Sequence, residues 1–188
     1  MPIVAYLGST VNEYRKNSLS FLLLLEIFCQ KHPNERMKHH DQYARGIKET
    51  GEKILINRLI CPICRCTIAV LPDFLLPYKQ YSANEIEAVL IDAETINVYG
   101  IETKASVYTV RRWIKTMQPR VTAWISLLKT RAVELTGNAV SEVRLAGLGL
   151  ISQIQCLSEY LPKIRYCGNM LGFASIYLCN YAMFRFST

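Results

Sequence analysis

Three cysteines are crowded into the run Cys61-Pro-Ile-Cys64-Arg-Cys66. Two cysteines separated by two residues form half of a typical structural zinc site, which takes four soft or borderline ligands in a tetrahedron. Cys29 and His32 have the same spacing, and residues 33–60 separate the two pairs. We therefore predict a structural Zn²⁺ site with the ligands Cys29, His32, Cys61 and Cys64.

The ligand set and the metal itself have alternatives. His39, His40 or Cys66 could replace one of the four ligands. A single CxxC is also typical of redox pairs, but the thioredoxin-like βαβ context of such pairs is missing here. Without a metal, the cysteines would pack as small hydrophobic residues. The odd total of seven cysteines argues against a secreted disulfide framework, so we predict a reduced, cytoplasmic protein.

The segments around the two pairs predict a β-hairpin. Residues 54–60 are rich in β-branched and aliphatic side chains and lead into Cys61. Residues 43–48 are the natural partner strand, across a turn at residues 49–52. A hairpin with metal ligands at its ends is a zinc ribbon, which we assign to residues 29–71, after an apolar segment at residues 1–28.

Helical patterns dominate the remainder of the chain. A capping-box sequence at residues 82–85 predicts a helix that runs to about residue 94. A second helix is predicted over 106–117, ended by Gln118-Pro119, and a third starts at Pro119 and ends with Gly137 as its C-cap. The predicted fold class is α+β: a small β-hairpin zinc ribbon, a linker and helix-turn-helix at 72–118, and a C-terminal helical region at 119–188.

Two apolar runs raise the question of export or membrane insertion. Residues 19–25 follow basic residues, as in a signal peptide, but Glu26 ends the run and no small-residue cleavage site follows. Residues 166–184 carry no charge, yet their asparagines, glycines and aromatic residues do not suit a lipid-facing helix. We predict a buried strand or short helix against the ribbon for the first run, a buried helix or hairpin for the second, and no membrane association.

The charge is positive and unevenly distributed. The net charge is +7, and residues 111–131 contain six basic residues and no acidic one. Such a patch fits a polyanionic partner, either nucleic acid or an anionic membrane surface. In the predicted helix 106–117, Arg111, Arg112 and Lys115 fall on the side opposite the apolar stripe.

A helix-turn-helix places its second helix in the major groove of DNA. Under that interpretation the candidate DNA-binding residues are Lys104, Ser106, Tyr108, Thr109, Arg111, Arg112 and Lys115. From the pattern alone, a solvated basic face on an ordinary amphipathic helix is the better explanation. The neighbouring metal pairs and the single sign of the patch favour double-stranded DNA as the partner, and they leave open whether the protein forms a homodimer.

A longer similarity supports the same interpretation. The run from Cys61-Pro-Ile-Cys64 through Leu71-Pro-Asp-Phe-Leu-Leu-Pro-Tyr78 to Ser82 resembles a bacterial family of domains of unknown function. Its members resemble the N-terminal parts of insertion-sequence transposases, so the resemblance implies a zinc ribbon, a linker and a helix-turn-helix over residues 29–117. The segments 40–45 and 105–113 are similar to the family's post-knuckle and recognition-helix segments. His32 stands where the family usually has cysteine, and Cys66 where glycine is common.

A resemblance to transposases also raises the question of catalysis. Strand-transfer nucleases need carboxylates that hold two magnesium ions. No aspartate follows Asp92, and the later Glu134, Glu142 and Glu159 fall in predicted helices. We therefore expect no catalytic residues and no small-molecule substrate. The predicted function is zinc-dependent DNA binding by a transposase-derived or transposon-related protein without a catalytic core; the alternative is a zinc-ribbon protein–protein interaction module with no nucleic-acid role.

Overall fold

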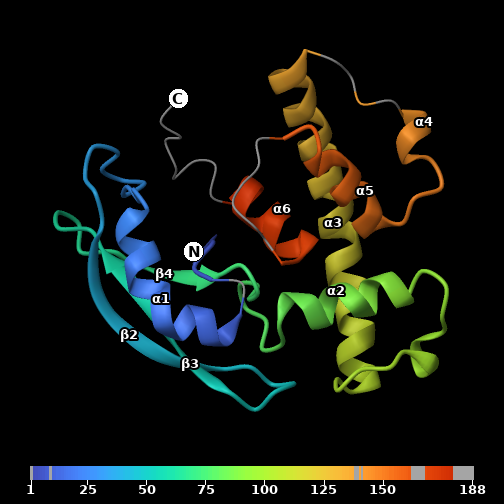
Figure 1. Cartoon of the computed structure of the whole chain (residues 1–188), viewed down its shortest axis with the longest axis horizontal. Helices are drawn as coiled ribbons and strands as arrows, with labels where there is room; N and C mark the ends of the chain where they lie inside the picture. Colours follow the sequence, from blue (N-terminus) through green and yellow to red (C-terminus); the bar gives the residue numbers. More distant parts are fainter. Residues whose placement is uncertain (1, 9, 138–139, 141, 162–167, 180–188) are drawn as a thin grey trace.

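The computed structural model describes residues 2–8, 10–137, 140, 142–161 and 168–179 (Figure 1). The α+β class is confirmed: one four-stranded sheet is joined to a group of helices. The strands are β1 (Ile3–Ala5), β2 (Lys38–Gly46), β3 (Lys53–Ile60) and β4 (Thr67–Pro72). The helices are α1 (Val11–Leu24), α2 (Ala83–Asp92), the short 3-10 helix η1 (Val98–Gly100), α3 (Val107–Thr136), α4 (Glu142–Leu145), α5 (Leu150–Ser158) and α6 (Met170–Cys179).

The predicted hairpin is present and belongs to a larger sheet. β2 and β3 pair in antiparallel fashion, with Tyr43 opposite Ile56. The sheet order is β1-β4-β3-β2, and β1 pairs in parallel with β4, with Ile3 opposite Val70. The apolar N-terminal segment therefore contributes a strand to the same sheet as residues 29–71. The sequence does not indicate β1, because three residues are too few to show strand periodicity.

The apolar run 19–25 lies mainly in α1 rather than in a strand. Thr10 caps this helix by accepting a hydrogen bond from the backbone N–H of Glu13. The hydroxyl of Tyr14 donates a 2.7 Å hydrogen bond to the carbonyl of Leu55, which fastens α1 to the sheet. The expectation of a buried run is wrong for Leu19, Leu23 and Leu24, which are 48%, 64% and 74% exposed.

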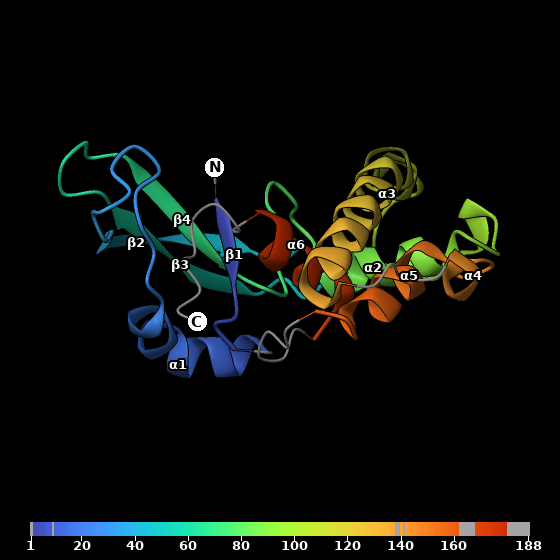
Figure 2. The ribbon, with the colours of Figure 1, turned by 90° about the horizontal axis from the view of Figure 1, so that it is seen from above.

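Two hydrophobic clusters form the core. The first lies between the sheet and α1, and the second gathers side chains of α2, α3, α5 and α6. Helix α6 contributes to both, since Ile176 belongs to the first cluster, whereas Leu171 and Ala174 belong to the second. Figures 1 and 2 show α6 between the sheet and the long helix α3.

The prediction that one helix ends at Gln118 and another begins at Pro119 is wrong. Helix α3 runs without interruption from Val107 to Thr136, with Pro119 inside it. An interior proline costs roughly 3 kcal/mol, because it removes one backbone hydrogen bond and crowds the preceding turn. The buried stripe of α3 keeps its helical spacing across the proline, and this continuous packing offsets the cost. The stripe consists of Val110, Trp113, Met117, Val121, Trp124, Ile125, Leu128 and Ala132. Gly137 is the C-cap, as predicted, in the left-handed conformation.

Helix α2 begins as its capping box predicts, because the Ser82 side chain accepts a hydrogen bond from the backbone N–H of Glu85. Residues 93–106 then separate α2 from α3 and include η1. This connection is longer than the turn of about three to four residues in a helix-turn-helix. Within the run 166–184, the described residues include the buried helix α6; residues 166–167 and 180–184 lie outside them. In the described part of the chain, no helix has the length and apolar character needed to cross a membrane.

Candidate metal centre and basic surface

The first ligand pair lies on a tight turn between α1 and β2. The backbone N–H of His32 bonds to the carbonyl of Cys29, and the N–H of Cys29 bonds to the carbonyl of Glu35. Phe28 and Arg36 form an isolated β-bridge that closes the turn. The turn thereby brings the Cys29 thiol and the His32 ring to the same side of the backbone, with Cys29 buried.

The second pair lies in the connection between β3 and β4. The N–H of Arg65 bonds to the carbonyl of Cys61, and the N–H of Cys61 bonds to the carbonyl of Cys66. Arg65 adopts a positive φ of 59°, which lets the chain reverse within a few residues. Cys61 is fully buried at the end of β3. Figures 1 and 2 place both ligand turns at the end of the sheet remote from α3.

The four predicted ligands form one cluster. The ligand atoms of Cys29, His32, Cys61 and Cys64 all lie within 4.8 Å of one another. The Cys29 and Cys64 sulfurs are 3.6 Å apart, and Nδ1 of His32 is 3.8 Å from the Cys29 sulfur and 3.7 Å from the Cys61 sulfur. Sulfur ligands at about 2.3 Å from a tetrahedral metal lie about 3.8 Å from each other. The cluster could therefore hold a metal ion.

Hydrogen bonds within the cluster favour thiolates at Cys29, Cys61 and Cys64 and a proton on the His32 ring, which must lose that proton to bind a metal. The pKa of His32 is raised to about 9 by hydrogen bonds with the thiols of Cys29, Cys61 and Cys64. Burial acts to raise the pKa of the Cys29 thiol, but hydrogen bonds from His32 and nearby backbone N–H groups outweigh it, so the pKa is lowered. The pKa of Cys64 is lowered first by a backbone hydrogen bond at Cys66. Thiolate is the form of cysteine that binds metals.

The residues that could replace one of the four ligands differ in how close they lie to the cluster. The Cys66 sulfur lies 3.1 Å from that of Cys64 and 3.7 Å from that of Cys29. Its pKa is raised to about 12, first by its hydrogen bond with Cys64 and then by burial. His39 and His40 lie on β2, where Nε2 of His39 is 3.1 Å from the amide oxygen of Asn57. Among the alternatives, then, Cys66 is the residue that the fold brings to the cluster.

The candidate DNA-binding residues divide into two groups. Ser106 caps α3 through the backbone N–H of Thr109, and the Lys104 ammonium donates to the carbonyl of Glu49. Arg111 stacks over the ring of Tyr99, with its guanidinium 5.1 Å from the ring centre. These four residues therefore make contacts within the protein.

Tyr108, Arg112 and Lys115 form the second group. They are exposed on α3 and lie on the side opposite the buried stripe. Arg112 and Lys115 have no carboxylate partner among the described residues. Both cations are therefore available to an external anion.

Two further cations join this face, and sequence analysis did not select them. The Lys79 ammonium lies 3.5 Å from the hydroxyl of Thr116 on α3. The pKa of Lys79 is lowered by burial and by the charges of Arg120 and Arg112. We name the set Lys79, Arg112, Lys115 and Arg120 the basic surface. Arg120 follows Arg112 by eight positions and so was detectable by helical spacing, whereas Lys79 joins the set through tertiary structure alone.

Comparisons with known proteins bear on one part of the chain. No curated protein and no solved structure matches it. The model of a family described as a domain of unknown function (DUF6431) matches residues 29–113. The matched segment starts at the first cysteine of the metal cluster and ends within the first turns of α3. Residues 29–113, which hold the metal cluster and lead into α3, are therefore similar to the DUF6431 domain.

Proposed function

We propose that this protein binds double-stranded DNA through the basic surface. We also propose that a structural Zn²⁺ ion stabilises the sheet. The observation that carries the proposal is the unpaired positive charge along the exposed part of α3 and the loop beside it. Arg112, Lys115 and Arg120 are exposed on α3, without carboxylate partners in the part of the chain that the structure describes.

Like charges held close together destabilise one another, and phosphate groups relieve this repulsion. The lowered pKa of Lys79 reports part of the repulsion, since Arg120 and Arg112 both contribute to it after burial. A DNA duplex offers a regular array of phosphates, and cations that neutralise them release condensed counterions. This term gives binding that does not depend on sequence; base contacts from Arg112 or Tyr108 would add specificity.

Zinc is proposed as the ion because of its ligand chemistry. Three thiolates and one imidazole in a closed tetrahedron are typical of structural zinc, and they leave no coordination position for a substrate. In this proposal the ion cross-links the turns at Cys29 and Cys61. We extend the proposal to a transposon-related origin without a catalytic core, supported by the resemblance carried by residues 61–82 and 105–113.

The test is fluorescence anisotropy of the zinc-loaded protein with a labelled random-sequence duplex. One phosphate contact for each of the four cations of the basic surface predicts that log K falls against log salt concentration with a slope of about −3.6. If the zinc-loaded protein does not bind the duplex at low salt, the proposal is refuted. A slope near zero would also contradict it, because the binding would then not involve phosphate neutralisation.

One observation favours a second candidate function, docking to a protein partner. Leu19, Leu23 and Leu24 of α1 are large apolar side chains with about half or more of their surface exposed. Such side chains are common at interaction surfaces. If the duplex assay fails, a protein-interaction module becomes the better interpretation, and a Leu23→Glu variant would test whether a candidate partner docks on α1.

A further inference from the structure

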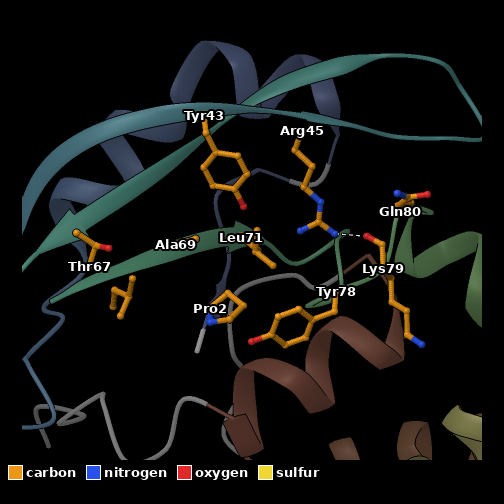
Figure 3. Close-up of a pocket in the computed structure, with 10 residues that line it drawn as sticks. Pro2, Tyr43, Arg45, Thr67, Ala69, Leu71, Tyr78, Lys79 and Gln80 are labelled. Carbon is orange, nitrogen blue, oxygen red and sulfur yellow. Dashed lines mark hydrogen bonds between the residues drawn. The ribbon is translucent and has the colours of Figure 1, made fainter.

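A cleft opens between the sheet and the loop that precedes α2 (Figure 3). Its volume is about 590 Å³, within the range of small-molecule pockets. The floor is formed by residues of β4, and Tyr43 and Arg45 project into it from β2. The ring of Tyr78 forms the opposite wall. Two aromatic rings and one cation therefore face the same space.

Arg45 is the cation at this cleft. Its Nη2 donates to the carbonyl of Leu76, at 2.9 Å, and to that of Lys79, so the guanidinium is fixed against the loop. The pKa of Arg45 is lowered, chiefly by burial. No carboxylate among the described residues neutralises it. A guanidinium has five N–H donors, and a phosphate group matches its geometry.

Tyr78 presents an aromatic ring from a strained backbone. Its φ is 62°, in the left-handed region that residues other than glycine adopt only at a cost. The residue is 80% exposed, so core packing does not account for this conformation. Strained residues of this kind concentrate at ligand-binding sites. The ring of this residue lies at the wall of the cleft.

The cleft adjoins a second cavity that reaches the basic surface. The second cavity, of about 200 Å³, shares Pro2 and Tyr78 with the cleft and extends to Arg120 and Trp124 on α3. Ser175 lines this second cavity, and its hydroxyl is buried without a hydrogen-bond partner in the described structure. The path from Arg45 past Tyr78 to Arg120 thus alternates cations and aromatic rings, as in proteins that hold single-stranded nucleic acid.

We propose that the cleft binds one unpaired nucleotide of a DNA strand, with its phosphate against Arg45 and its base against the ring of Tyr78. The inference rests on the proposed DNA binding and deepens it. Duplex DNA would lie on the basic surface, and a neighbouring unpaired nucleotide would enter the cleft. Stacking of one base on an aromatic ring strengthens binding about ten-fold.

The experiment compares three labelled ligands on the full zinc-loaded chain: a duplex, the same duplex with a single-stranded overhang, and adenosine monophosphate. Two variants distinguish the contribution of the Tyr78 ring to affinity from that of its backbone conformation. Tyr78→Gly removes the ring and relieves the strain, whereas Tyr78→Phe keeps the ring. Leu24→Ala on α1 is the control for removal of an exposed apolar side chain.

We expect the overhang to tighten binding about ten-fold over the duplex. Tyr78→Gly should abolish that gain without changing the affinity for the duplex, and Tyr78→Phe and Leu24→Ala should retain it. If the overhang still tightens binding to the Tyr78→Gly variant, the inference is overturned. The proposed function stands in that case, provided that the duplex binds. Tyr78-dependent binding of adenosine monophosphate without an overhang gain would assign the cleft to a free nucleotide and overturn the DNA-strand assignment. Loss of duplex binding in the unmodified chain refutes both proposals.

Discussion

The sulfur of Cys29 lies 3.6 Å from the sulfur of Cys64, although 35 positions separate the two residues in the chain. Cys29 lies between α1 and β2, and Cys64 between β3 and β4. A metal at this point would tie two loops of the sheet together, as a cross-link does.

Cys61→Ser should remove the metal and destabilise the fold. Cys61 is fully buried in the cluster, and a serine hydroxyl is a poor zinc ligand. We expect about one equivalent of zinc in the unmodified protein, far less in the variant, and a clearly lower melting temperature. Elemental analysis and thermal unfolding measure both. Cys156→Ser is the matched control, since Cys156 is a free cysteine on α5 outside the cluster; equal zinc content in the two variants would contradict the assigned site.

Removal of the ion with a chelator should loosen the sheet before the helices. The cluster joins the ends of β2, β3 and β4, while α3 lies at the far end of the molecule (Figure 2). Hydrogen exchange should therefore accelerate first in residues 38–46 and 53–60, with α3 protected longer. Uniform acceleration across sheet and helices would show that the metal stabilises the whole molecule as one unit.

Lys115→Gln should weaken duplex binding and its salt dependence together. Loss of one phosphate contact reduces the magnitude of the log-log salt slope by about 1. Lys16→Gln removes the same charge from an exposed position on α1 and serves as the control. Anisotropy titrations over a range of salt concentrations compare the two. Equal effects would mean that net charge, rather than the basic surface, governs binding.

Pro119→Ala should raise the stability of the protein. The alanine supplies a backbone N–H that the helical pattern pairs with the carbonyl of Lys115. We expect the free energy of unfolding to rise by about 1–3 kcal/mol. Urea denaturation measures it, with Ser126→Ala, an exposed change on the same helix, as the reference. A loss of stability would show that the packing of α3 depends on a bend at the proline.

Deprotonation of Tyr14 should lower the free energy of unfolding at alkaline pH. Burial raises its pKa to about 12, above the ordinary value of 10. The folded state therefore holds the phenolic proton more tightly than the unfolded state, so this contribution is complete below pH 10 and is lost as the pH rises through 12. Denaturation at pH 9 and pH 11.5 should show a larger difference for the unmodified protein than for Tyr14→Phe. Equal differences would assign the alkaline loss to other groups.

Sequence reasoning succeeded where the signal is local. Ligand spacing identified Cys29, His32, Cys61 and Cys64 as one cluster, and the side-chain preferences of residues 54–60 identified β3. The Ser82 cap and the Gly137 cap follow from chemistry within one turn of each helix end. Each of these features depends on residues that are close in the chain.

The failures involve features that only tertiary structure decides. Pro119 is a strong local stop signal, but packing on both sides of it keeps α3 continuous. β1 has three residues and forms because β4 is present beside it. Lys79 belongs to the basic surface through its proximity to α3, and the cleft around Arg45 is assembled from β2, β4 and the loop at 77–80. No single segment carries these signals.

Helix α6 has a consequence for how the molecule melts. Ile176 packs with the sheet, while Leu171 and Ala174 pack with the helices, so neither cluster can be taken apart without exposing one side of the same helix. The described structure therefore predicts coupled unfolding: calorimetry should record one transition whose van 't Hoff enthalpy equals the measured enthalpy. With the metal bound, two cores that share a helix in this way unfold as one cooperative unit, whereas removal of the metal loosens the sheet side of α6 first.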